Sequence, residues 1–304
     1  MSDTQSLQIL DRPSYIGMIV ALPFFLLSFA AYTILPLKRG HGKTFICFFA
    51  SCFAAYMFYV VTHYIPHHES VSSSVCVTLT VILIYWILAM FCWLSAILHD
   101  GMMNIRDVIG YWDKISIQRR RRFWIYSAFS WSAPLFFVVL ILTINQVGPK
   151  NSSYVPGLTD AKCWLNDGIP SFTYLYLPVT VTIIADVVIL ILMAMAVRQN
   201  KKGVSGSSRK KIVIKLRDYV LFFLIFLVLW LFDMVAWVTT WMNGSVPVAF
   251  WYAFEVVNAC SGVAVFYLSV FRKTMRLLFQ KRYREIRQNW RKQYDMGVYN
   301  PDDN

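Results

Sequence analysis

The chain has 304 residues, of which 58% are apolar, and its mean hydropathy is +0.52. Soluble domains contain about 45–50% apolar residues, so this composition excludes an ordinary soluble protein. A net charge of +13 would suggest a nucleic-acid partner in a soluble chain, but here the charges lie between apolar segments. The composition therefore predicts a protein that crosses a membrane several times.

Seven apolar segments follow one another along the chain, each long enough to cross about 30 Å of hydrocarbon as a helix. We expect the spans at 15–37, 44–65, 75–98, 123–145, 172–197, 219–241 and 249–271. The predicted fold is an all-α membrane protein, a bundle of seven transmembrane helices. Its expected parts are an extracellular tail at 1–14, the membrane domain at 15–271 and a cytoplasmic helix and tail at 272–304.

Basic residues predict the direction of the chain in the membrane. Of the 29 lysines and arginines, 26 follow the first, third, fifth and seventh spans, and only Arg12, Lys150 and Lys162 fall on the other side. Because basic residues are enriched on the cytoplasmic side, this distribution predicts the N-terminus outside and the C-terminus inside.

Three residues on the predicted outer side suit an oxidising compartment. Cys76, at the start of the third span, and Cys163, in the second outside loop, are candidates for a disulfide bond, the alternative being two free thiols. The other four cysteines lie within spans. Asn151 begins an Asn-Ser-Ser sequon and is a candidate glycosylation site.

Three carboxylates, Asp186, Asp233 and Glu255, fall within spans, where a charge is costly and often functional. The rise of a helix places Asp233 roughly 12 Å and Glu255 roughly 9 Å below the outer ends of their spans, with Asp186 deeper. We interpret the upper two as part of an acidic, aromatic-lined outer cavity for a neutral or cationic ligand. Its candidate contacts are Asp233, Glu255, His63, Tyr174, Trp237 and Tyr252, with Tyr176 and Trp251 nearby. The alternative is that each carboxyl is protonated, or hydrogen-bonded to a neighbouring helix, and has a structural role.

The inside segments are basic and short. Those at 99–122 and 198–218 have about 20 residues each, too few for a catalytic domain. Within the second, 201–209 is rich in glycine, serine and lysine and predicts a flexible linker. After residue 271, apolar residues recur at near-helical spacing among arginines and lysines, which predicts an amphipathic helix along the inner leaflet.

Motifs for enzymes and other membrane proteins are missing from the sequence. It contains no zinc-protease, phosphate-binding or nucleophile-elbow motif, so we expect no catalytic activity and no cofactor. The last span, 249–271, has no lysine that could hold retinal, and no inverted repeat of a transporter is evident.

Several motifs together resemble a G-protein-coupled receptor of the secretin, adhesion and methuselah group and the related cyclic-AMP-receptor-like group. They are Cys76, Trp93-Leu94-Ser95, Ser130-Trp131-Ser132-Ala133-Pro134, Cys163-Trp164 and Asn258-Ala259-Cys260-Ser261-Gly262. The third span ends in Leu98-His99-Asp100-Gly101, unlike the Asp/Glu-Arg-Tyr of rhodopsin-like receptors. The short tail at 1–14 departs from secretin and adhesion receptors, which have large extracellular domains.

This resemblance implies a plasma-membrane receptor in which an outside ligand shifts the bundle and opens an inner crevice for a heterotrimeric G protein. The residues expected to face that crevice are Arg119, Arg120, Arg209, Lys210 and Lys211, unless they serve only to set topology. The alternative is a transporter or channel that uses the three carboxylates, and a third possibility is a ligand-independent scaffold. A continuous polar path across the membrane would favour transport, and a cavity closed at its inner end would favour a receptor.

Overall fold

The fold is a bundle of helices, described here from a computed structural model. It covers residues 15–35, 41–68, 72–109, 115–149, 152–158, 164–166, 168–199, 206–271 and 273–298. Within these residues, seven helices are long and apolar enough to cross a membrane, which confirms the predicted number of spans. They are α2 (Ile16–Ile34), α3 (His41–His68), α4 (Ser73–Ile109), α5 (Ile115–Val147), α7 (Leu177–Gln199), α8 (Gly206–Asn243) and α9 (Val248–Val270).

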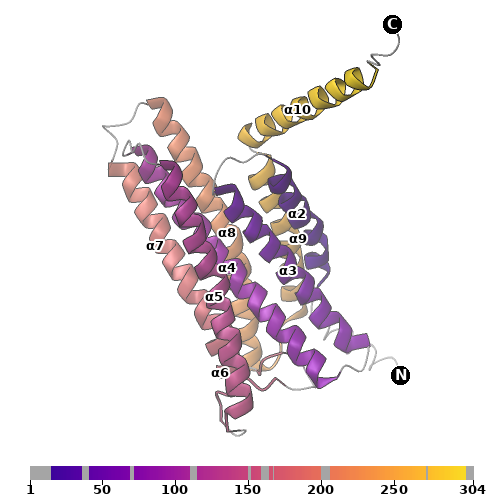
Figure 1. Ribbon diagram of the computed structural model, residues 1–304. Coiled ribbons are helices and arrows are strands. Elements are labelled where there is room, and N and C mark those ends of the chain that lie inside the picture. Colours follow the sequence, from indigo (N-terminus) through magenta and orange to yellow (C-terminus); the bar gives the residue numbers. More distant parts are fainter. Residues whose placement is uncertain are drawn as a thin grey trace.

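Three further elements complete the described chain. A single turn, α6 (Ile169–Ser171), and a π-helical turn, η1 (Phe172–Tyr176), lead directly into α7. After α9 comes α10 (Lys273–Val298), which projects from the bundle in Figure 1. It carries the predicted amphipathic pattern, with Met275 buried and Leu278 and Phe279 half-buried near its start, while Trp290 is exposed.

Consecutive spans run in opposite directions, so the helices begin and end at two opposite ends of the bundle (Figure 1). We name them the α6 end, where α8 ends and α9 begins, and the α10 end, where α9 ends and α10 begins. The charge pattern predicts the α6 end outside and the α10 end inside.

Helices extend beyond the apolar segments at the α10 end. The segment 99–122, expected to be a loop, is mostly helical, because α4 continues to Ile109 and α5 begins at Ile115. Likewise α8 begins at Gly206, within the segment expected to be a flexible linker. Apolarity marks where a helix meets lipid, whereas its backbone hydrogen bonds continue past that level whatever the side chains are.

The centre of the bundle is α4, which lies against α3, α5 and α7. Its side chain Trp93 is fully buried and packs edge-on against Trp131 of α5, with 5.4 Å between ring centroids. Leu94, Ile97 and Leu98 are also inaccessible. The Trp-Leu-Ser motif of the third span therefore belongs to the core.

Small residues allow α2 and α9 to approach closely. A Cβ atom on Gly262 of α9 would lie 2.7 Å from the Cα of Ala21, and one on Gly17 would fall against the backbone of Glu255. Close backbone approach at small residues is a common basis of helix association in membranes. A hydrogen bond ties the same region to α3, since the Tyr56 hydroxyl donates to Asn258 Oδ1 over 3.1 Å.

Candidate functional site

A cavity of about 250 Å³ lies in the half of the bundle nearer the α6 end, among α3, α4, α8 and α9. Ten of its lining residues are aromatic. They are Tyr56, Tyr59, Phe91, Trp164, Tyr176, Phe226, Trp230, Trp237, Trp251 and Phe254. A mostly apolar concavity with a few convergent polar groups is the usual form of a small-molecule site.

Asp233 supplies the charge of this cavity. Among the described residues that line it, Asp233 is the only carboxylate and none is a lysine, arginine or histidine. Trp230 and Trp237 lie on the same face of α8, about one turn to either side of Asp233. The phenol groups of Tyr176 and Tyr59 are its polar neighbours from the facing helices.

The π-helical turn η1 positions Tyr176 opposite these indoles. The Tyr176 ring centroid lies 5.1 Å from that of Trp230 and 4.7 Å from that of Trp237. Pro178 follows two residues later and has no N–H, and the Leu177 N–H bonds five residues back to the Phe172 carbonyl. The wider turn thus has an identifiable cause in the sequence.

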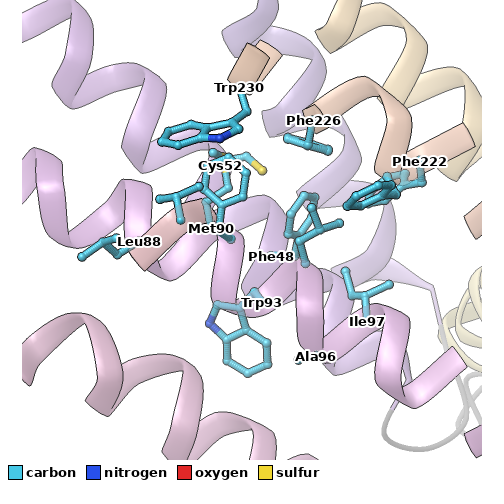
Figure 2. Close-up of a cluster of buried hydrophobic side chains, with 14 of the residues drawn as sticks. Phe48, Cys52, Leu88, Met90, Trp93, Ala96, Ile97, Phe222, Phe226 and Trp230 are labelled. Atoms are coloured by element: carbon cyan, nitrogen blue, oxygen red, sulfur yellow. The ribbon is translucent and has the colours of Figure 1, made fainter. Parts of the chain in front are cut away.

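On its α10 side the cavity is closed by a group of buried aromatic rings, which we call the aromatic plug. Its members are Tyr32, Phe45, Phe48, Phe49, Phe222 and Phe226. Figure 2 shows Phe48 of α3 facing Phe222 and Phe226 of α8, with centroid distances of 5.3 Å and 5.2 Å. Because Phe226 also lines the cavity, the plug forms its floor.

Asp233 and Trp237 line the cavity, and three other predicted contacts lie elsewhere. Tyr174 is buried, and its hydroxyl donates to the Tyr154 carbonyl over 2.9 Å, which holds the segment 152–158 against the helix. Tyr252 is 67% exposed on the outside of the bundle, and Glu255, whose backbone packs against Gly17 of α2, is not among the lining residues.

The face of α9 explains the displacement of Tyr252. Trp251, Phe254 and Asn258, spaced three and four residues apart, form the stripe that lines the cavity. Tyr252 is about 100° round the helix from Trp251 and on the side away from Phe254, so it points away. Depth in the membrane, which placed Glu255 and Tyr252 in the expected site, does not determine the direction in which a side chain points.

Asp186 is separate from the cavity. It is fully buried between α7 and α4, and neither of its carboxylate oxygens has a hydrogen-bond partner among the described residues. The neighbouring Ser95 hydroxyl on α4 is buried and unpartnered in the same sense. The three intramembrane carboxylates therefore occupy three different places and do not line one polar path within the described chain.

Several predicted residues fall outside the described part of the chain. Cys163 and Asn151 do so entirely, whereas His63, Arg119, Arg120, Arg209 and Lys211 lie in helices whose side chains are not described at these positions. Lys210 is exposed near the start of α8, at the α10 end. Cys76 is disulfide-bonded, and the other described cysteines are free thiols. Its pairing with Cys163 stays a prediction.

Comparison with known protein families identifies the family of the chain. The model of the family described as "7 transmembrane receptor (Secretin family)" matches residues 7–265. The chain belongs to this family. As a secretin-family receptor with seven membrane-spanning helices, it is a multi-pass protein of the plasma membrane.

Curated proteins similar to the chain include three from Drosophila. "G-protein coupled receptor Mth2" of Drosophila simulans is 24% identical over 284 residues, covering 89% of this chain and 51% of the relative. "Probable G-protein coupled receptor Mth-like 10" of Drosophila melanogaster is 23% identical, covering 89% and 49%. "Probable G-protein coupled receptor Mth-like 4" of the same species is 27% identical, covering 73% and 42%. The chain thus spans about half the length of these curated relatives.

Proposed function

We propose that this protein is a receptor that transmits the binding of an extracellular ligand to heterotrimeric G proteins. The observation that carries the proposal is a cavity near the α6 end, closed toward the α10 end by the aromatic plug, in a member of the secretin family. The ligand is neutral or cationic, because Asp233 is the charged group of the cavity lining. The protein has no catalytic activity of its own.

The proposed orientation assigns a role to each end. The α6 end faces outward, with a Cys76–Cys163 disulfide and a glycan on Asn151, and the α10 end faces the cytoplasm. Arg119, Arg120, Arg209, Lys210 and Lys211 then belong to the cytoplasmic rim, where a G-protein α subunit would bind. The support is the charge distribution, with 26 of 29 basic residues on that side.

Coupling between the two ends would pass through α8. Its half nearer the α6 end carries the cavity residues Trp230, Asp233 and Trp237, and its other half carries Phe222, which packs into the plug against Phe48. A ligand that contacts the cavity face of α8 changes the position of this half of the helix. The aromatic plug holds the other half. A ligand that binds one position of α8 more tightly shifts the population toward it.

The transport alternative has less support. A relay would need the carboxylates to share a continuous path, but only Asp233 lines the cavity, and the plug beneath it is aromatic. Asp186 lies buried against Ser95, and the backbone of Glu255 packs against α2.

The test is G-protein nucleotide exchange in membranes that contain this chain, measured against a panel of α subunits. Phe222→Ala removes a ring that holds α8 to α3, so we expect it to raise basal exchange severalfold with at least one α subunit. Phe136→Ala is the matched control, because Phe136 is 64% exposed on the lipid-facing side of α5. The protein is a transporter if neither the unmodified chain nor Phe222→Ala stimulates exchange on any α subunit, while liposomes that contain the chain show an ion flux that Asp233→Asn abolishes.

A further inference from the structure

We propose that the cavity binds the ammonium group of a small organic amine, held by Asp233 and the aromatic rings around it. This deepens the receptor proposal and rests on it only in taking the cavity as the ligand site. The inference follows from where the carboxylate lies, from the charges around it and from the size of the cavity.

The aromatic rings nearest Asp233 come from two elements, α8 and η1. Trp230 and Trp237 lie on the same face of α8 as Asp233, and the Tyr176 ring packs against both indoles, with centroid distances of 5.1 Å and 4.7 Å. A cation held at this carboxylate shares the cavity with these rings, whose negative quadrupoles attract it wherever a ring face turns toward the cavity. The attraction is strongest where water is displaced, as it is in a cavity with ten aromatic lining residues.

The charge of Asp233 has no cationic partner among the described lining residues. The phenols of Tyr59 and Tyr176 beside it are hydroxyl donors that orient a carboxylate but leave its net charge in place. A neutral ligand that filled the cavity would remove water from this charge without replacing it, which is costly. An anion would add repulsion, so an ammonium group is the complement that the cavity selects.

The volume restricts the rest of the ligand. At about 250 Å³ the cavity lies below the roughly 300–1,000 Å³ of most drug-sized sites. Trp164, Trp251 and Phe254 supply apolar walls away from Asp233. A single aromatic ring on a short alkyl chain, ending in an amine, matches both the size and the chemistry.

The direct test is binding to the full chain in lipid nanodiscs, with tritiated 2-phenylethylamine as the probe. Unlabelled 2-phenylethylamine, 2-phenylethanol and 3-phenylpropionate then compete as a cation, a neutral molecule and an anion of similar shape. We expect the amine to compete at least tenfold better than the alcohol, and the anion not to compete. Equal competition by the alcohol, or no specific amine binding up to millimolar concentration, would overturn the proposal.

Substitutions locate the binding. Asp233→Asn keeps the shape of the side chain and should weaken amine binding at least tenfold, while Glu255→Gln, outside the cavity on α9, should leave it unchanged. Trp237→Phe should retain more amine affinity than Trp237→Leu, because an aromatic face is kept. Thermal unfolding of each variant shows whether it is folded. Unaltered binding in folded Asp233→Asn protein would also refute the ammonium site.

This binding assay contains no G protein, so the two proposals can fail separately. Amine binding that depends on Asp233, without nucleotide exchange by any α subunit, would support the ammonium site and contradict the receptor function. Exchange stimulated by Phe222→Ala, without amine binding, would do the reverse.

Discussion

Two sides of the bundle differ in how closely they are packed. The packed side is formed by α2, α3, α4 and α9. Among these helices, the buried share of the most apolar stretch is 50% for α3 and 56% for α4. On the open side, formed by α7 and α8, the corresponding share is 28% for each helix. The cavity lies where the two sides meet. A helix with fewer buried contacts moves at lower cost, so α8, which lines the cavity with several side chains, is an element that a ligand would displace readily.

The largest effect is expected from breaking the packed side. Gly262→Leu places a side chain against the Ala21 backbone, where even a Cβ would lie 2.7 Å from Cα. Such overpacking typically costs about 1–3 kcal/mol, and here it must also separate α2 from α9. We expect a clear fall in the melting temperature of the purified protein. Val263→Leu, at an exposed position of the same helix, is the control, and equal melting temperatures would contradict close α2–α9 packing.

A smaller effect is expected from removing one buried hydroxyl on the packed side. Tyr56→Phe deletes the hydroxyl that donates to Asn258 Oδ1 over 3.1 Å, and a typical intramolecular hydrogen bond contributes about 0.5–1.5 kcal/mol net to stability. Tyr252→Phe is the matched control, because Tyr252 is 67% exposed on the same helix as Asn258. Thermal unfolding should separate the two variants, and the same shift in both would argue against the bond.

The smallest effect on stability is expected where the two sides meet. Ala236→Leu adds the bulk of a leucine to α8 beside the cavity, where free volume can accept it, so its stability should change by less than about 0.5 kcal/mol. The same variant should lose binding of 2-phenylethylamine, since the added side chain occupies the site. A destabilisation as large as that of Gly262→Leu would mean that the cavity does not exist in the folded protein.

The seven helical spans could be predicted from hydropathy, because apolar segments of this length report the membrane directly. The orientation that the charges predict stays a prediction. What hydropathy missed was the length of the helices: α4 continues to Ile109 and α8 begins at Gly206, beyond the levels where apolar side chains are needed. Polar residues at those levels are compatible with a helix. Hydropathy responds only to apolar residues, so it could not show that these helices continue.

The candidate site could be predicted only in part. Asp233 stood out because a charge within a span is costly, and Trp237 is one turn away on the same face. Glu255 and Tyr252 met the same depth criterion, but neither lines the cavity, and the exposed Tyr252 points away from it. The opposing position of Tyr176 depends on the π-helical turn, for which Pro178 was the available signal. The plug could not be recognised, since phenylalanine is common in any membrane span.

The aromatic plug also has an electrical consequence. When a ligand reaches the cavity from the α6 side, as we propose, water and ions on the same route carry the potential of that side inward, so the voltage across the membrane would fall mainly over the plug and the residues beyond it. Moving one elementary charge through the full membrane voltage involves about 2.3 kcal/mol per 100 mV. An ammonium ion that stops at Asp233 crosses little of that drop, and its affinity should therefore hardly vary with membrane voltage.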